Sequence, residues 1–252
     1  MSRRTCSSLL VATAAALAGA AAVRGAPPPV GQHPRTAVVG GVRVRYLLYL
    51  PAAFGRDPAR RWPLVLYLHG MGERGTDLRY LIRHPLPKLL ATKRDFPAIV
   101  VSPQLPLAYD AWEPLFAPLV GLLDRVEARY PVDPSRVYLT GLSMGGFGTW
   151  ELGMRHPERF AALVPIAGGW RFGTPRNPAA LCRLRDTPVW AFHGAADEIV
   201  PAERTEVFVE ELRACGGTPR FTLYPAVGHE GSWTRAYASA ALWRWLFAQR
   251  RG

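Results

Sequence analysis

The chain has 252 residues, of which 49% are hydrophobic and 20% charged, and 31 basic side chains stand against 19 acidic ones. This hydrophobic content excludes a wholly disordered chain, and three cysteines are too few for a small disulfide-stapled protein. The length fits one α/β domain. Beyond the N-terminus, no apolar run approaches the roughly 18 residues that a membrane span requires.

The formal net charge of +12 does not indicate a nucleic-acid partner. Lys88 and Lys93 are the two lysines, and the arginines are spread along the whole chain. The sequence contains neither a block rich in lysine and arginine nor a known nucleic-acid-binding motif. We therefore expect no nucleic acid among the partners.

The N-terminal segment resembles a cleavable secretory signal. Arg3 and Arg4 precede an uncharged, alanine-rich stretch over residues 9–22, and small residues and three prolines follow. We expect a signal peptide over residues 1–25 and one domain over 26–252, secreted or periplasmic in a bacterium. After cleavage, no stable membrane span is expected.

Cleavage would also remove one of the three cysteines. Cys6 lies in the predicted signal, so Cys182 and Cys215 remain in the mature chain. In an exported protein these two cysteines either form a disulfide or stay as two buried thiols. The sequence alone leaves both alternatives open, as it does the oligomeric state.

Strand and helix patterns alternate along the rest of the chain. Residues 36–39 and 42–50 are β-rich and flank Gly40-Gly41, which predicts a hairpin. Short apolar runs then predict buried strands over 64–68, 98–101, 137–140, 163–166, 189–192 and 221–224. Apolar periodicity predicts helices over 115–130, 145–155, 203–214 and 233–249. This alternation predicts a doubly wound, mostly parallel sheet that opens with an antiparallel hairpin.

The first chemical motif is Gly141-Leu142-Ser143-Met144-Gly145, which lies between a predicted strand and a predicted helix. A sharp strand-to-helix turn leaves no room for Cβ atoms beside the serine, and so it requires glycines. The turn holds the Ser143 hydroxyl out of the sheet, which predicts a nucleophile.

A second motif, His69-Gly70-Met71-Gly72, follows the predicted strand over 64–68. Acyl transfer requires two backbone N–H groups directed at the oxyanion of the tetrahedral intermediate. We expect Met144, the residue after the nucleophile, to supply one and Met71 or its immediate neighbour to supply the other. His69 precedes the serine in the chain, so we expect it to brace the loop.

Three histidines follow Ser143 and compete for the role of general base. His156 lies in a helix stop, and His193 ends a strand, where it is better suited to shaping the loop of the acid. His229 lies between a strand and the last predicted helix, so we expect it to be the base.

The acid that orients this base is expected in the loop after the strand over 189–192. Asp197 is the first candidate in that loop, and Glu198 is its neighbour. Asp186 precedes the strand and therefore lies at the wrong end of it.

Four segments, HGMGERG, GLSMGGFGTW, HGAADEIVP and GHEGSW, resemble the α/β-hydrolase superfamily. The match is with its bacterial branch of feruloyl and acetylxylan-type esterases and related "predicted peptidases", over residues 40–250. The resemblance implies a three-layer α/β-hydrolase fold with helices on both faces of the sheet. It also implies a Ser143-Asp197-His229 triad, with Met71 and Met144 at the oxyanion hole.

Aromatic residues near the expected site mouth are candidates for substrate binding. Trp112, Trp170 and Trp233 are expected near that mouth, where they could stack on a sugar or aryl ring, and core packing is the competing interpretation. No metal-ligand spacing such as H-x-x-x-H or C-x-x-C occurs in the sequence, so we expect no metal and no cofactor.

The leading functional hypothesis is a secreted serine esterase that acts on a small or polysaccharide-linked ester, of acetyl or feruloyl type. A serine peptidase of the prolyl-oligopeptidase kind is the second hypothesis. A non-catalytic binding protein on the same fold is the third, and the competent residues at every triad position disfavour it.

Overall fold

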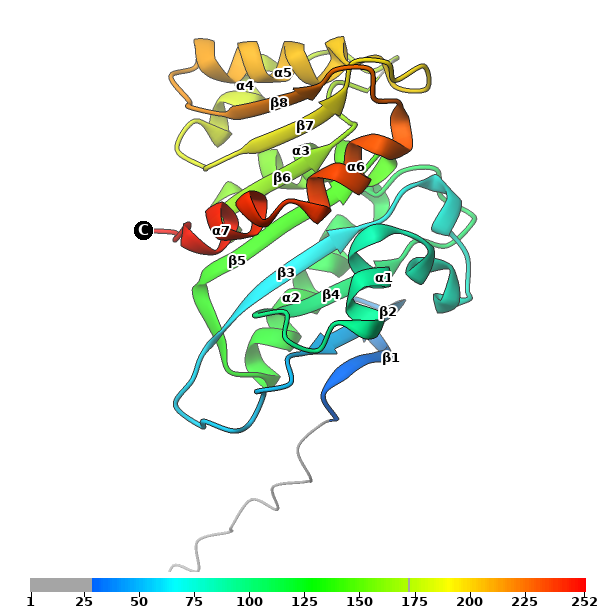
Figure 1. Cartoon of the computed structure of the whole chain (residues 1–252), viewed down its shortest axis with the longest axis vertical. Helices are drawn as coiled ribbons and strands as arrows, with labels where there is room; N and C mark the ends of the chain where they lie inside the picture. The colour runs from blue at the N-terminus through cyan, green and yellow to red at the C-terminus, as the bar shows by residue number, and fades with distance from the viewer. Residues whose placement is uncertain (1–28, 172) are drawn as a thin grey trace, which may run out of the picture.

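The computed structural model describes residues 29–171 and 173–252, which form a central sheet of eight strands (Figure 1). The strands are β1 (Gly31–Val39), β2 (Val42–Leu50), β3 (Trp62–Leu68), β4 (Ile99–Gln104), β5 (Val132–Leu142), β6 (Ala162–Ile166), β7 (Trp190–Gly194) and β8 (Arg220–Tyr224). Their order in the sheet is β1-β2-β4-β3-β5-β6-β7-β8. The predicted signal peptide lies outside the described residues.

The direction of the strands follows the predicted pattern. β1 and β2 form an antiparallel hairpin, β2 also pairs antiparallel with β4, and the pairs from β4 to β8 are parallel. Every residue of β3 is buried, as expected of a central strand that is covered on both faces. The prediction of a mostly parallel sheet opened by an antiparallel hairpin is confirmed.

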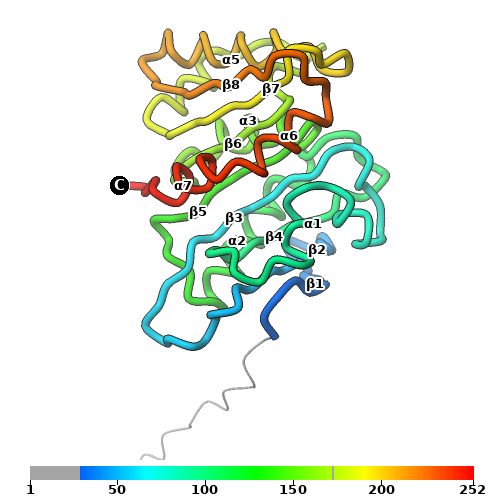
Figure 2. Tube along the Cα trace, in the orientation of Figure 1, coloured from blue at the N-terminus to red at the C-terminus, as the bar shows by residue number. Residues whose placement is uncertain are grey.

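Helices cover both faces of this sheet. The α-helices are α1 (Pro85–Thr92), α2 (Phe116–Arg129), α3 (Met144–Arg155), α4 (Pro178–Leu181), α5 (Glu203–Ala214), α6 (His229–Ala238) and α7 (Ala240–Ala248). The apolar faces of α1, α6 and α7 pack on one side of the sheet, and those of α2, α3 and α5 pack on the other. The tube in Figure 2 shows β1 and β8 at opposite edges of the sheet. The predicted three-layer arrangement is thus confirmed.

The helices α1 and α4 were not predicted, and the last predicted helix is wrong in its extent. The expected single helix over 233–249 is two helices, α6 and α7, which are separated at Ser239. Ser239 has an extended backbone, and its Oγ accepts a hydrogen bond from the Leu242 N–H. A serine that caps a new helix competes with continuation of the old one, and this accounts for the break.

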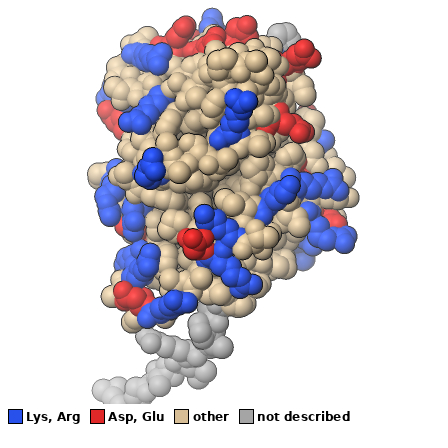
Figure 3. Space-filling view, viewed as in Figure 1, with Lys and Arg blue, Asp and Glu red and all other residues tan. Residues whose placement is uncertain are grey.

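The basic charge is dispersed on the face of the molecule that Figure 3 shows. In Figure 3, lysine and arginine side chains are scattered over the visible face with uncharged surface between them. None of the helices in the described ranges is long and apolar enough to cross a bilayer.

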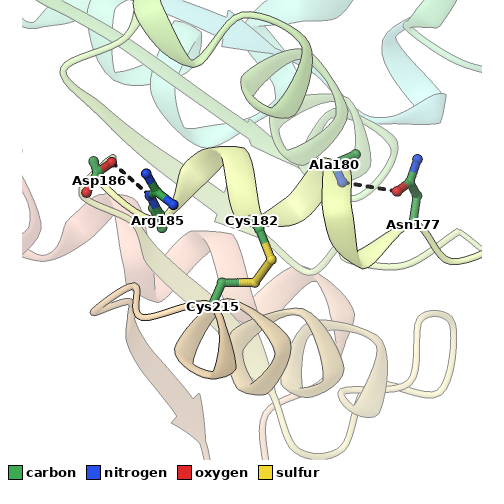
Figure 4. Close-up of a disulfide and its surroundings, with 6 residues drawn as sticks. All are labelled: Asn177, Ala180, Cys182, Arg185, Asp186 and Cys215. Carbon is green, nitrogen blue, oxygen red and sulfur yellow. Dashed lines mark hydrogen bonds and ion pairs between the residues drawn. A yellow bond between two sulfur atoms is a disulfide. The ribbon is translucent and has the colours of Figure 1, made fainter.

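The structure resolves the alternative that the sequence left open for the cysteines. Cys182 begins the 3₁₀-helix η5 (Cys182–Leu184), Cys215 directly follows α5, and the two form a disulfide (Figure 4). Their Cα atoms are 5.3 Å apart, and the bridge spans a sequence separation of 33 residues. The bridge ties the segment before β7 to the helix after it.

We expect removal of this bridge to destabilise the protein. Cross-linking a loop of this length restricts the unfolded chain, so the double variant C182A/C215A should lose about 3 to 4 kcal/mol of unfolding free energy. Urea unfolding under oxidising and reducing conditions measures this loss. Dithiothreitol should lower the stability of the native chain and leave that of the double variant unchanged. Equal stability of the two chains under oxidising conditions would contradict the expectation.

Candidate active site

Ser143 lies in the sharp turn between β5 and α3, and its backbone is strained. Its φ of 52° and ψ of −117° lie outside the usual regions for a residue with a side chain. A Cβ atom on Gly141 would lie 2.3 Å from the Gly145 carbonyl oxygen, and one on Gly145 would lie 2.0 Å from that of Leu68. These contacts explain why the turn requires glycines. The Ser143 N–H donates to the Ile166 carbonyl at 2.9 Å, which anchors the turn to β6.

Three side chains from distant parts of the sequence meet at this turn. The Ser143 Oγ lies 2.9 Å from His229 Nε2, and His229 Nδ1 lies 2.6 Å from Asp197 Oδ2. Asp197 follows β7 in the expected loop, whereas His229 is the first residue of α6 rather than a loop residue. The structure thus brings together the serine, histidine and aspartate that the sequence singled out.

The hydrogen bonds define the state of the histidine. An ionised Asp197 only accepts hydrogen bonds, so His229 Nδ1 carries the proton and Nε2 is free to accept from the Ser143 hydroxyl. Burial raises the pKa of Asp197, but hydrogen bonds from His193, His229 and the Val200 N–H outweigh burial and lower it well below its usual range. The carboxylate therefore stays charged at neutral pH.

The competing histidines and carboxylates lie elsewhere or have other partners. His193 is buried, and its Nε2 lies 3.1 Å from Asp197 Oδ2 and 2.8 Å from the Val200 carbonyl oxygen, so it supports the loop of the acid as expected. Among the others, Glu198 is exposed, His156 pairs with Glu158, and Asp186 pairs with Arg185.

The loop that begins with His69 places the peptide group between Gly70 and Met71 next to the serine, since a Cβ atom on Gly70 would lie 3.6 Å from that of Ser143. The Leu105 N–H donates to His69 Nε2 at 2.9 Å, so His69 Nδ1 carries the proton and donates to the Gly70 carbonyl at 2.5 Å. In a trans peptide the C=O and N–H point in opposite directions, so His69 directs the Met71 N–H away from itself. Burial lowers the pKa of His69 to about 4, which keeps this imidazole neutral. His69 thus braces the loop, and its two ring nitrogens bond to Gly70 and Leu105.

Two backbone N–H groups near Ser143 are available as donors. The Met144 N–H belongs to the first turn of α3, where helical N–H groups have no acceptor within the helix. Within residues 29–171 and 173–252, neither this group nor the Met71 N–H donates a hydrogen bond. This arrangement can bind a negatively charged oxygen.

A cavity of about 310 Å³ opens beside the serine. Its lining is mostly apolar and also includes Asp110 and two arginines, Arg171 and Arg204. The apolar lining residues are Met71, Met144, Phe147, Ile199 and Val200. Ile199 is 72% exposed and Met71 52%, so apolar side chains stand at the mouth.

The three tryptophans do not line this cavity. Trp112 is fully buried, and its Nε1–H donates to the His69 carbonyl at 3.0 Å, so its ring supports the loop and has no surface for a ligand. Trp233 is 4% exposed and packs edge-on against the His229 ring. Trp170 lines a separate cavity of about 370 Å³. Core packing, the competing interpretation, therefore describes Trp112 and Trp233.

The ion pair between Glu73 and His84 near the site was not recognised from the sequence. Glu73 is buried and pairs with His84, whereas its neighbour Arg74 donates to the carbonyls of Met71 and Tyr109. Glu73 lies in the HGMGERG motif, but His84 has no sequence signal that would connect it to the site.

Sequence comparisons relate the chain to known hydrolases. Residues 119–240 match the dienelactone hydrolase family. The chain is 28% identical over 155 residues to a "Bifunctional acetylxylan esterase/xylanase" of Neocallimastix patriciarum, which covers 60% of this chain but only 22% of that protein. It is also 28% identical over 212 residues to a "Probable carboxylesterase" of Oryza sativa subsp. japonica, covering 75% of this chain and 79% of that one.

Solved structures show the same fold. A thermostable esterase of known crystal structure is 32% identical in sequence to this chain. The match covers 88% of this chain and 64% of the esterase, and the TM-score is 0.73. The feruloyl esterase module from Clostridium thermocellum is 18% identical and shares the fold, with a TM-score of 0.65 over 90% of this chain and 92% of that one. The chain therefore belongs to the α/β-hydrolase superfamily, within which it matches the dienelactone hydrolase family.

Proposed function

We propose that this protein is an exported serine hydrolase that cleaves carboxylic esters through Ser143, His229 and Asp197. The observation that carries the proposal is the continuous set of hydrogen bonds from Ser143 Oγ through His229 to Asp197. The names of the similar proteins, an acetylxylan esterase and a carboxylesterase, support an ester as the substrate.

The geometry supports a two-step reaction through an acyl-enzyme. His229 Nε2 takes the Ser143 proton as Oγ attacks the ester carbonyl, and the resulting oxyanion accepts hydrogen bonds from the Met71 and Met144 N–H groups. Asp197 stabilises the imidazolium that forms. His229 then protonates the leaving alcohol, and a water molecule activated by the same imidazole hydrolyses the acyl-enzyme.

Serine, rather than cysteine, is the nucleophile in this proposal. Residue 143 follows β5 at the strained turn, and its hydroxyl contacts the imidazole. Cys182 and Cys215 are oxidised to a disulfide with each other, so neither supplies a thiolate.

The cavity favours an acyl group larger than acetyl. Its volume of about 310 Å³ is roughly ten times the ~30 Å³ that one water molecule occupies in the liquid. An acetyl group would leave most of this apolar space unfilled. We therefore favour an aromatic acyl group of feruloyl size, with a polysaccharide as the alcohol.

Two observations support export. The sequence of residues 1–25 has the pattern of a secretory signal, and the Cys182–Cys215 disulfide suits an oxidising compartment. A secreted or periplasmic location fits an ester that is part of a polymer outside the cell.

The nucleophile is tested first. S143A removes the attacking oxygen, so kcat on p-nitrophenyl butyrate should fall by about 10⁶-fold, to the background rate. The variant should unfold at the same temperature as the native protein. Hydrolysis by S143A at more than a few per cent of the native rate would show that another group attacks the ester.

The acid is tested with a matched pair of variants. D197N removes the charge that fixes the His229 tautomer, and kcat should fall by about 10⁴-fold. E198Q makes the same change at the exposed neighbouring residue and should leave kcat unchanged. If E198Q lost activity and D197N kept it, the two assignments would have to be exchanged.

A panel of substrates separates the enzymatic alternatives. Methyl ferulate and feruloylated oligosaccharide should be cleaved with higher kcat/KM than acetylated xylan or p-nitrophenyl acetate, because the larger acyl group fills the apolar cavity. Peptides with blocked termini, including ones that contain proline, test for peptidase activity. Peptide cleavage without ester cleavage would favour a serine peptidase instead.

A further inference from the structure

A buried carboxylate lies directly behind the loop that presents the Met71 N–H. Glu73 is 2% exposed, and it ends the 3₁₀-helix η1 (Met71–Glu73), of which Met71 is the first residue. Its Oε1 accepts a hydrogen bond from His84 Nε2 at 2.6 Å. A buried carboxylate is costly without a partner, so this pair fixes Glu73 in place.

The other carboxylate oxygen of Glu73 lies close to the same loop, which begins with His69 and Gly70. Its Oε2 lies 3.7 Å from His69 Nδ1, and a Cβ atom on Gly70 would lie 3.3 Å from that oxygen. The backbone carbonyl of Glu73 accepts a hydrogen bond from Gln104 Nε2 at 2.9 Å. Because η1 is only three residues long, anchoring its last residue also sets the position of its first N–H.

One aromatic ring, that of Trp233, lies between His84 and the general base His229. The His84 ring meets the Trp233 ring edge-on at 5.8 Å, and Trp233 meets the His229 ring edge-on at 4.7 Å. Trp233 is 4% exposed, so it is confined between the two imidazoles. The hydrogen bond from His84 to Glu73 raises the pKa of His84, with burial opposing the shift, which favours a charged partner for the carboxylate.

We propose that Glu73 and His84 are a positioning pair whose hydrogen bond holds the Met71 N–H in register with Ser143. The inference rests on the proposed function and deepens it, because neither residue contacts the substrate in the reaction described above. The oxyanion donor is thereby connected to this ion pair.

Two substitutions of His84 separate its hydrogen bond from its ring. H84Q keeps an amide N–H donor close to the position of Nε2 and loses the ring, whereas H84F keeps the ring against Trp233 and loses the donor. We expect H84F to lower kcat by roughly 10- to 100-fold with KM unchanged, since small displacements of catalytic groups have effects of this size. H84Q should stay close to the native kcat.

The readout is kcat for each titrated active site, with p-nitrophenyl butyrate as substrate and a fluorophosphonate as titrant. In H84F the buried Glu73 carboxylate loses its hydrogen-bond partner, which could destabilise the variant. E73Q/H84F also removes that carboxylate, so it should fold even if H84F is unstable, and it should show the same loss of kcat. R79Q, at a side chain that is 86% exposed in the adjacent 3₁₀-helix η2 (Leu78–Arg83), is the matched control.

A purely structural role would lower the melting temperature and leave kcat for each titrated site at the native value, and that result would overturn the inference. Equal loss of kcat in H84Q and H84F would overturn it as well, because the hydrogen bond would then not be the positioning contact. Failure of the proposed function is a distinct outcome, since the native protein itself would then neither hydrolyse the ester nor react with the titrant.

Discussion

The close approach of the first turn of α3 to the ends of β3 and β5 is the constraint on which the rest of the site depends. Gly145 lies so near the Leu68 carbonyl that no larger residue fits, and Ser143 adopts its strained backbone as a result. The strain is maintained by the buried sheet around it, in particular by the hydrogen bond to Ile166. This geometry exposes one hydroxyl and one unpaired N–H at the same place.

The other groups of the site are placed around the Ser143 hydroxyl by contacts between segments that are far apart in the sequence. His229 begins α6 after β8, and Asp197 lies in the loop after β7. Both lie at the carboxyl ends of the parallel strands, where α/β folds place their reacting groups. The His69 imidazole, kept neutral by burial, orients the peptide that carries the second N–H. Electrostatic preorganisation of this kind costs no rearrangement during the reaction.

The sequence was informative where local chemistry determines structure. Glycines at a strand-to-helix turn, short apolar runs and the order of Ser143, Asp197 and His229 are each compatible with few structures. The strands, the turn at Ser143 and the candidate triad were therefore predictable. The break at Ser239 was not, because a serine inside an amphipathic pattern competes with the helix only when the surrounding packing permits it. Burial of Trp112 and pairing of Glu73 with His84 depend on contacts between distant segments, for which the sequence has no periodic signal.

The central claim is that Ser143 forms a covalent acyl-enzyme, and mass spectrometry of the intact protein tests it most directly. The native protein, mixed with a slowly hydrolysed p-nitrophenyl ester and quenched in acid, should gain the mass of one acyl group. Peptide mapping should place that group on the peptide that contains Ser143, and S143A should gain no mass. An acyl group on any other residue, or turnover of the ester with no trapped adduct and no reaction with a fluorophosphonate, would contradict the account.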